Sequence, residues 1–223
     1  MSAPLEVLHC DNHLLVVVKP ACLPCVPDAS GDESLLERAK AWVKREHEKP
    51  GEVFLGVVHR LDRPVSGVVA FARTSKGARR LGQQFRARGV RKLYRGVVAG
   101  APRASEGELV QWLRKDAARN RVEVRAEGAR DAKRAVTRWR ALRSSGGRTL
   151  LELEPLSGRP HQLRVACAEL CAPLLGDLKY GAPEPLADGS IALHALALEL
   201  EHPTRRERLR FECAPPDSPW WRV

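Results

Sequence analysis

Apolar and polar residues follow one another along the chain in patterns that predict more strands than helices. Residues 14–18 are continuously apolar and are followed by Lys19-Pro20, which is typical of a buried strand that enters an irregular loop. Residues 68–72 form a second such run. Further strand-like segments, several with period-two alternation, are 93–99, 135–142, 149–153, 191–200 and 207–213.

Apolar residues at helical spacing predict a first helix between the two leading strands. Its expected buried face contains Leu35, Leu36, Ala39, Trp42 and Val43. Ser30 or Asp32 is the expected N-cap, and residues 49–51, Lys-Pro-Gly, should end the segment.

A second helix is expected from about Ser75 to Gly89, with its apolar face formed by Ala78, Leu81 and Phe85. Arg79 and Arg86 lie on the opposite face of this helix. That face contains no acid, unlike an ordinary solvated helix surface, so phosphate binding is the favoured interpretation. A third helical stretch covers residues 159–171, after a turn at 157–160.

These elements indicate one α+β domain over residues 1–223, built on a mixed, largely antiparallel sheet with flanking helices. The first strand is expected near residue 14. This leaves no room for a separate N-terminal RNA-binding module, and a monomer without an obligatory protein partner suffices.

Charge narrows the class of partner. The formal net charge is +11, and residues 63–105 contain eleven Lys and Arg but no acid. This segment therefore has a positive charge equal to the net charge of the whole chain. Such clustering favours a polyanionic partner over a basic composition that serves only solubility.

Cysteines and apolar runs exclude several classes of site and location. Cys22 and Cys25 have zinc-like spacing, but no second pair completes a four-ligand site, so no metal is expected. No apolar run reaches the roughly 18 residues that span a bilayer, and the first residues do not resemble a signal peptide. A cytoplasmic protein with reduced thiols is therefore expected.

The segment 59–67, His-Arg-Leu-Asp-Arg-Pro-Val-Ser-Gly, is the strongest candidate for chemistry. It sets Asp62 between Arg60 and Arg63, which favour its ionised form, and Pro64 and Gly67 restrict the loop. A surface turn with solvated ion pairs is the alternative for an isolated Asp-Arg pair.

Three segments together resemble the RluA-type RNA pseudouridine synthases. They are His-Arg-Leu-Asp at 59–62, Lys-Leu-Tyr at 92–94 and Gly-Arg-Pro-His-Gln-Leu-Arg at 158–164. Matches around Lys19-Pro20, at 176–181 and at 193–195 with 202–203 extend the resemblance over most of the chain. The resemblance implies a central RNA-binding cleft and the isomerisation of uridine in ribosomal or transfer RNA, without a cofactor.

By this resemblance Asp62 is the catalytic carboxylate, Tyr94 contacts the target base and Arg164 pairs with the carboxylate. A carboxylate near the anomeric carbon suits the breaking of a glycosidic bond. Asp62 either attacks the sugar or assists glycal formation, and both routes stay open.

The resemblance also implies residues that contact RNA. Arg60 enters the RNA beside the flipped uridine, and Leu163 packs on the uracil, although a core leucine is nearly as good an interpretation. Arg79 and Arg86 would bind phosphates. His59 and His161 are open between site and structural roles, with the structural role favoured for His161.

Two other functions compete with the enzyme. A catalytically silent RNA-binding protein on the same scaffold would have no need to keep Asp62, Tyr94 and Arg164 together. A carboxylate glycosidase would need a second acid and an aromatic-rich cleft, yet only 5% of the residues are aromatic.

Overall fold

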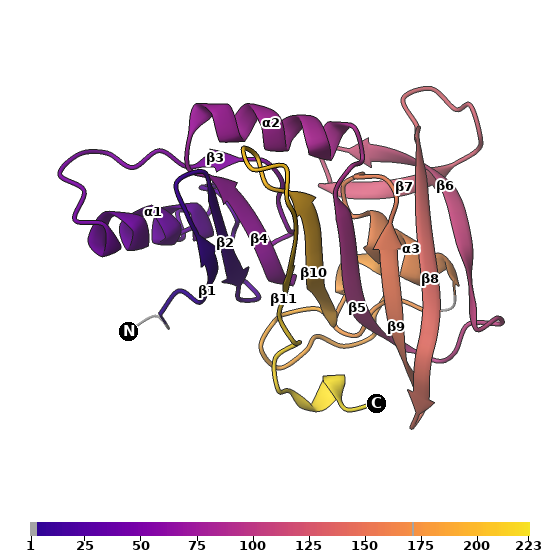
Figure 1. Ribbon diagram of the computed structural model, residues 1–223. Helices are drawn as coiled ribbons and strands as arrows, with labels where there is room; N and C mark the ends of the chain where they lie inside the picture. Colours follow the sequence, from indigo (N-terminus) through magenta and orange to yellow (C-terminus); the bar gives the residue numbers. More distant parts are fainter. Residues whose placement is uncertain (1–3, 171) are drawn as a thin grey trace. The chain divides into compact units, whose positions relative to one another are not determined.

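The computed structural model describes residues 4–170 and 172–223 (Figure 1). Its strands are β1 Val7–Cys10, β2 Leu14–Lys19, β3 Gly56–Val57, β4 Ser66–Ala72, β5 Arg91–Ala99, β6 Glu106–Asp116, β7 Arg121–Arg125, β8 Lys133–Ser145, β9 Arg148–Pro155, β10 Leu193–Glu201 and β11 Arg208–Glu212. Its helices are α1 Leu35–Glu46, α2 Ser75–Arg86 and α3 Gln162–Leu170, with short 3₁₀ segments at Leu178–Tyr180 and Pro219–Trp221.

The chain forms two compact units. The first contains the chain up to Arg91 together with Ala195–Ala214, and the second contains Lys92–His194 with Pro215–Val223. The first unit is therefore assembled from two stretches of sequence.

The first unit is built on strands in the order β1-β2-β4-β10, with β3 beside β4 and β11 beside β10. The pairs β1–β2, β2–β4, β3–β4 and β10–β11 are antiparallel. Residues of β2 and β4 are almost all buried because the strands have apolar side chains on both faces. This explains why both were predicted from continuous apolar runs.

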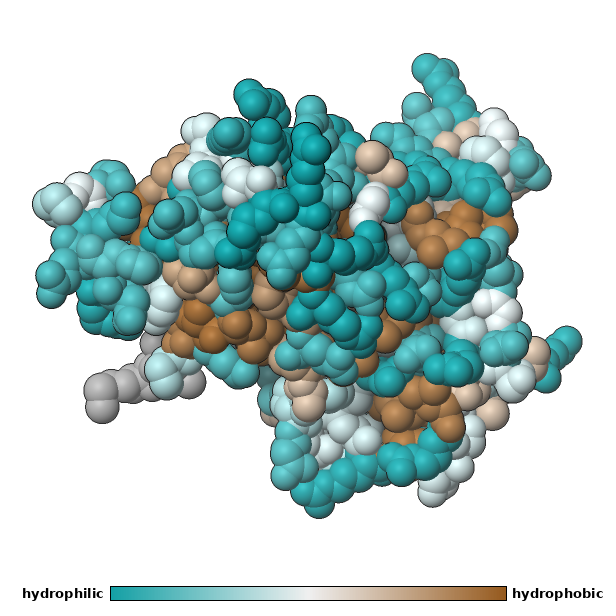
Figure 2. Space-filling model, viewed as in Figure 1, coloured by the Kyte–Doolittle hydropathy of each residue, from teal (hydrophilic) through white to brown (hydrophobic). Residues whose placement is uncertain are grey.

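Helix α2 covers one face of this sheet. Leu81 is fully buried among alternate residues of β2, β4 and β10, and Ala78 and Phe85 pack beside it. Arg79 and Arg86 are exposed on the opposite side of the helix, as predicted. In Figure 2, hydrophilic side chains cover the surface over α2.

The start of α1 differs from the prediction. Its N-cap is Ser34, whose hydroxyl accepts a hydrogen bond from the Glu37 amide while the Glu37 carboxylate accepts one from the Ser34 amide. Ser30 and Asp32 lie in the preceding loop, and the helix ends at Glu46, before the predicted stop. The reciprocal capping box outweighs the earlier candidates because it satisfies two amide donors together.

The second unit has strands in the order β5-β9-β8-β6-β7, with antiparallel pairs throughout. Helix α3 packs on this sheet through Val165 and Ala168, against Leu113, Val122 and Ala135. The predicted helix end at Cys171 lies outside the described residues.

Strands β1, β3, β6 and β7 were not predicted, and the first strand starts at Val7, not near residue 14. Strands β6 and β7 are rich in charged residues and largely exposed, so they lack the apolar pattern of buried strands. The predicted α+β class with a largely antiparallel sheet is confirmed, and the RNA-binding cleft stays a prediction. Within the described part of the chain, no helix is both long and apolar enough to span a bilayer.

Candidate functional site

Asp62 lies in the loop that leads into β4, and it is partly exposed. The amide of Val65 donates a hydrogen bond of 3.0 Å to the Asp62 carbonyl, which closes a turn around Pro64. Leu61, which precedes this turn, and Val65, its last residue, are buried, so the loop is anchored on each side of the carboxylate. Buried apolar side chains therefore anchor the loop that presents the Asp62 carboxylate to solvent.

Lys19 fixes this loop from the protein interior. Its side chain is fully buried, and its ammonium donates to the carbonyls of Pro20 at 3.0 Å, Leu23 at 2.7 Å and Arg63 at 2.9 Å. Three donors meet three acceptors, so the charge is buried without an unsatisfied N–H group. Burial lowers the pKa of Lys19 to about 8, although the charge of Asp62, among others, acts in the opposite direction.

The side chain of Arg63 serves the loop in a way that was not predicted. It binds the carboxylate of Asp32 and donates to the Ser30 hydroxyl at 3.0 Å. The Asp32 partner raises the pKa of the Arg63 guanidinium. Arg63 thus ties the loop 28–32 to the Asp62 loop, and its charge is not dedicated to Asp62.

His59 has a structural role at the start of the loop. Its Nε2 accepts a hydrogen bond of 2.9 Å from the Ala70 amide, and its ring stacks on Phe85 of α2 at 4.6 Å. Nε2 is therefore the acceptor nitrogen of the ring. Arg60, the next residue, is exposed.

Gly67 ends the loop in a conformation that only glycine adopts easily. Its φ is +122°, and a Cβ at this position would lie 2.3 Å from the Ala195 carbonyl oxygen. Strands β4 and β10 therefore approach each other closely where the Asp62 loop begins its strand.

In the second unit, Arg164 is held by Asp177. Nε and Nη2 of Arg164 donate to the two carboxylate oxygens of Asp177 at 2.8 and 2.6 Å, and both side chains are buried. This bidentate pair fixes the plane of the guanidinium. The guanidinium carbon also lies 5.1 Å from the centre of the Tyr180 ring.

Tyr180 connects α3 to β7 through its hydroxyl. The hydroxyl accepts a hydrogen bond of 2.9 Å from the Val122 amide and lies 2.7 Å from His161 Nδ1. Because the Tyr180 oxygen accepts from the Val122 amide, the Tyr180 hydroxyl can donate its own hydrogen bond to His161 Nδ1. The contact supports the structural role favoured for His161, whose φ of +50° is held just before α3.

The start of α3 is fixed by Gln162. Its side-chain oxygen accepts from the Ser157 hydroxyl at 2.7 Å, and its side-chain nitrogen donates to the Val136 carbonyl and the Thr137 hydroxyl, each at 2.9 Å. The segment that carries Leu163 and Arg164 is therefore tied to β8.

Tyr94 and Leu163 have different environments within this unit. Tyr94 is partly buried on β5, opposite Leu153 of β9. Leu163 is 6% exposed, which leaves its role as a base contact a prediction beside that of a core leucine. Arg164 and Leu163 are adjacent on α3, while Asp62, Arg60, Arg79 and Arg86 belong to the first unit.

Sequence reasoning did not single out Lys19 or Asp177 as functional residues, although both lie in segments that carried the resemblance. Lys19 ends a strand whose other residues are apolar, and this was the available signal. Asp177 had no local signal, because its partner is 13 positions away.

A family model described as RNA pseudouridylate synthase matches residues 13–169. The chain is 35% identical to ribosomal large subunit pseudouridine synthase D of Xanthomonas campestris pv. campestris, covering 96% of this chain and 67% of that protein. It is also 35% identical to the dual-specificity RNA pseudouridine synthase RluA of Haemophilus influenzae, covering 94% and 92%. Human RNA pseudouridylate synthase domain containing 4 is a structural neighbour with a TM-score of 0.79 and 29% identity, covering 95% of this chain and 89% of that one.

Proposed function

The chain belongs to the RNA pseudouridylate synthase family, and from this premise we propose that it converts specific uridines in structured ribosomal or transfer RNA to pseudouridine. The resemblance to RluA-type enzymes is confirmed by relatives at 35% identity over most of the chain. The protein acts as a monomer and needs no cofactor.

The reaction is an isomerisation that conserves all atoms and electrons. The bond between C1′ of the ribose and N1 of uracil breaks, the ring turns, and C1′ bonds to C5. C5 then loses its proton, and N1 carries one in the product. Asp62 supplies the carboxylate, either as a nucleophile at C1′ or as the base that assists glycal formation.

The observation that carries this assignment is the support of Asp62 by its loop. Lys19 donates to the Arg63 carbonyl at 2.9 Å, and Val65 donates to the Asp62 carbonyl at 3.0 Å, so the backbone on both sides of the carboxylate is held. Such preorganisation favours a transition state that demands a fixed carboxylate.

Tyr94 and Arg164 assist Asp62. Tyr94 packs on the uracil and moves a proton, and Arg164 orients the Asp62 carboxylate. The bidentate pair with Asp177 supports this role, because it fixes the plane and direction of the Arg164 guanidinium.

The target uridine reaches Asp62 after it has been flipped out of the RNA stack. Arg60, exposed two residues before Asp62, enters the RNA beside the flipped base, and Leu163 packs on the uracil. Arg79 and Arg86 on the outer face of α2 bind backbone phosphates.

The assignment is tested with Asp62→Asn, which keeps the size of the side chain but removes the carboxylate. Pseudouridine is mapped in total RNA from cells with the wild-type protein, with the variant and without the gene. We expect the modified positions to disappear with the variant as they do without the gene, while Asp131→Asn, which changes an exposed turn residue, restores them.

RNA binding is measured beside this assay with purified protein. Retained binding by Asp62→Asn with loss of pseudouridine supports the proposal. Undiminished modification by Asp62→Asn would overturn the catalytic assignment. RNA binding by the wild-type protein without any modified position would favour a silent RNA-binding protein.

A further inference from the structure

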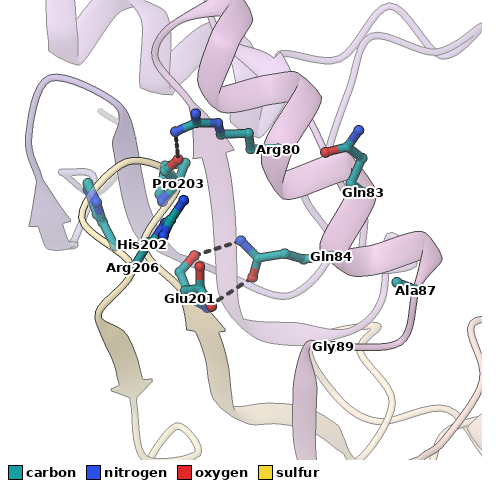
Figure 3. Close-up of a pocket in the computed structure, with 9 residues that line it drawn as sticks. All are labelled: Arg80, Gln83, Gln84, Ala87, Gly89, Glu201, His202, Pro203 and Arg206. Carbon is teal, nitrogen blue, oxygen red and sulfur yellow. Dashed lines mark hydrogen bonds between the residues drawn. The ribbon is translucent and has the colours of Figure 1, made fainter.

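A hollow of about 400 Å³ lies between α2 and the β10–β11 connection of the first unit (Figure 3). It is lined by Arg80, Gln83, Gln84, Ala87, Gly89, Glu201, His202, Pro203 and Arg206. We propose that this hollow binds a backbone phosphate of the RNA substrate, between the guanidinium groups of Arg80 and Arg206. The inference rests on the proposed function and adds a contact away from Asp62.

The helix and the β10–β11 connection are joined by hydrogen bonds across the hollow. The Gln84 side chain donates to the Glu201 carbonyl at 2.8 Å and accepts from the Glu201 amide at 2.9 Å. Nη1 of Arg80 donates to the Pro203 carbonyl at 2.7 Å. Figure 3 shows these bonds as dashed lines. The walls are therefore fixed before any ligand binds.

His202 fixes the connection itself. Its Nδ1 accepts from the amides of Thr204 at 3.3 Å and Arg205 at 3.0 Å, and its Nε2 lies 2.9 Å from the Asp11 carboxylate. Arg206 follows directly, with a φ of +58°. This tight turn determines where the Arg206 side chain starts.

The arginines of this part of the molecule fall into two groups. Those next to carboxylates form ion pairs: Arg91, Arg208 and Arg210 with Glu199, and Arg205 with Asp11 and Glu207. Among residues 4–170 and 172–223, Arg80 and Arg206 form no ion pair, and the single hydrogen bond of Arg80 goes to a neutral carbonyl. Neither guanidinium is paired with a carboxylate of the described residues, so both can bind an anion.

Charge and shape favour an RNA backbone over other anions. The lining has two cations and one carboxylate, that of Glu201, so its formal charge is positive. Arg80, Gln83 and Arg206 are exposed, so the hollow is open to solvent and suits a polymer that passes over it. The lining contains no Phe, Tyr or Trp, the usual stacking partners of bases, so it suits the sugar-phosphate backbone.

The hollow also lies beside the phosphate face proposed for α2. Arg79 and Arg86 project from the outer side of the helix, and Arg80 and Gln84 project toward the β10–β11 connection. A strand that contacts Arg79 or Arg86 can therefore meet Arg80 on the same helix, with Arg206 facing it.

The test measures the affinity of the full chain for a fluorescent RNA stem-loop over a range of salt concentrations. Arg80→Gln combined with Arg206→Gln should weaken binding several-fold and reduce the slope of log affinity against log salt by about one. The matched control, Arg208→Gln with Arg210→Gln, removes the same charge from arginines that are already paired, and it should leave the slope unchanged. An unchanged slope in the first variant would overturn the proposal.

Two further variants guard against misfolding and test the sign of the charge. Arg206→Gln alone removes no hydrogen bond within the described structure, so it should retain the melting temperature while it weakens RNA binding. Glu201→Gln removes the one carboxylate of the lining and should strengthen RNA binding, and weaker RNA binding would contradict a phosphate bound between Arg80 and Arg206. These readings are independent of isomerisation, because pseudouridine formation is measured separately and its absence would affect the proposed function alone.

Discussion

Arg164 and Asp177 form a buried bidentate pair in which two nitrogens of one side chain meet both oxygens of the other, at 2.8 and 2.6 Å. Asp177→Asn removes the negative charge of the bidentate partner that holds the buried Arg164 guanidinium. We expect the free energy of unfolding to fall by about 3–5 kcal/mol, measured by urea denaturation.

The control for this change is Asp217→Asn. Asp217 pairs with Arg222 at 2.8 Å, but both side chains are mostly exposed, so we expect a loss of less than about 1 kcal/mol. Equal stability of Asp177→Asn and the wild type would show that Arg164 does not depend on this carboxylate.

Lys19→Met should destabilise the Asp62 loop, because three carbonyl groups lose their donor inside the protein. A loss of about 2–4 kcal/mol is expected in urea denaturation, together with reduced pseudouridine formation. Lys44→Met, on the exposed side of α1, is the matched control and should change neither quantity.

The Lys19 ammonium also gives stability a dependence on alkaline pH. Burial lowers its pKa from the ordinary 10.5 to about 8, so between these values the unfolded chain holds a proton that the folded chain has released. The stability of the wild type relative to Lys19→Met should therefore rise with pH from about 8 to 10.5. A constant difference over this range would mean that Lys19 titrates normally.

Gly67→Ala should prevent stable folding of the first unit. The new Cβ would lie 2.3 Å from the Ala195 carbonyl oxygen in addition to the unfavourable φ of +122°. A loss of at least about 3 kcal/mol is expected in thermal or urea unfolding. Gly51→Ala, where a Cβ meets nothing within 4 Å, should be harmless by comparison.

Arg79→Gln with Arg86→Gln should weaken RNA binding and flatten its salt dependence, because a variant with fewer phosphate contacts releases fewer counterions when it binds. The measurement is the slope of log affinity against log salt with the same RNA stem-loop. If the slope stays at the wild-type value, the outer face of α2 does not meet RNA.

The pattern of apolar and polar residues predicted the elements that are either buried throughout or have one buried and one exposed face. Strand β4 is buried at every position, and α2 buries Leu81 while it exposes Arg79, so both were visible in the sequence. Strands β6 and β7 were missed because they are largely exposed, and in β6 the polar Gln111 is buried while its apolar neighbour Val110 is exposed, which breaks the alternation.

The site was predicted unevenly for a related reason. The short motif at 59–67 identified the Asp62 loop, since its residues are adjacent in sequence. The supports of the site come from distant positions: Lys19 contacts Arg63, 44 residues away, and Tyr180 contacts Val122, 58 residues away. Such pairs follow from tertiary packing, which a single sequence does not display.

The bond between His202 and Asp11 joins residues 191 positions apart. The first unit therefore remains incomplete on the ribosome until nearly the whole chain has been made, because Leu198 and Leu200 of its core are supplied only after residue 194. Most of the second unit, from Lys92 to His194, is synthesised in one piece and can begin to fold earlier. The Asp62 loop is thus translated early, but the first unit that supports it is completed only after the segments with Tyr94 and Arg164 have been synthesised.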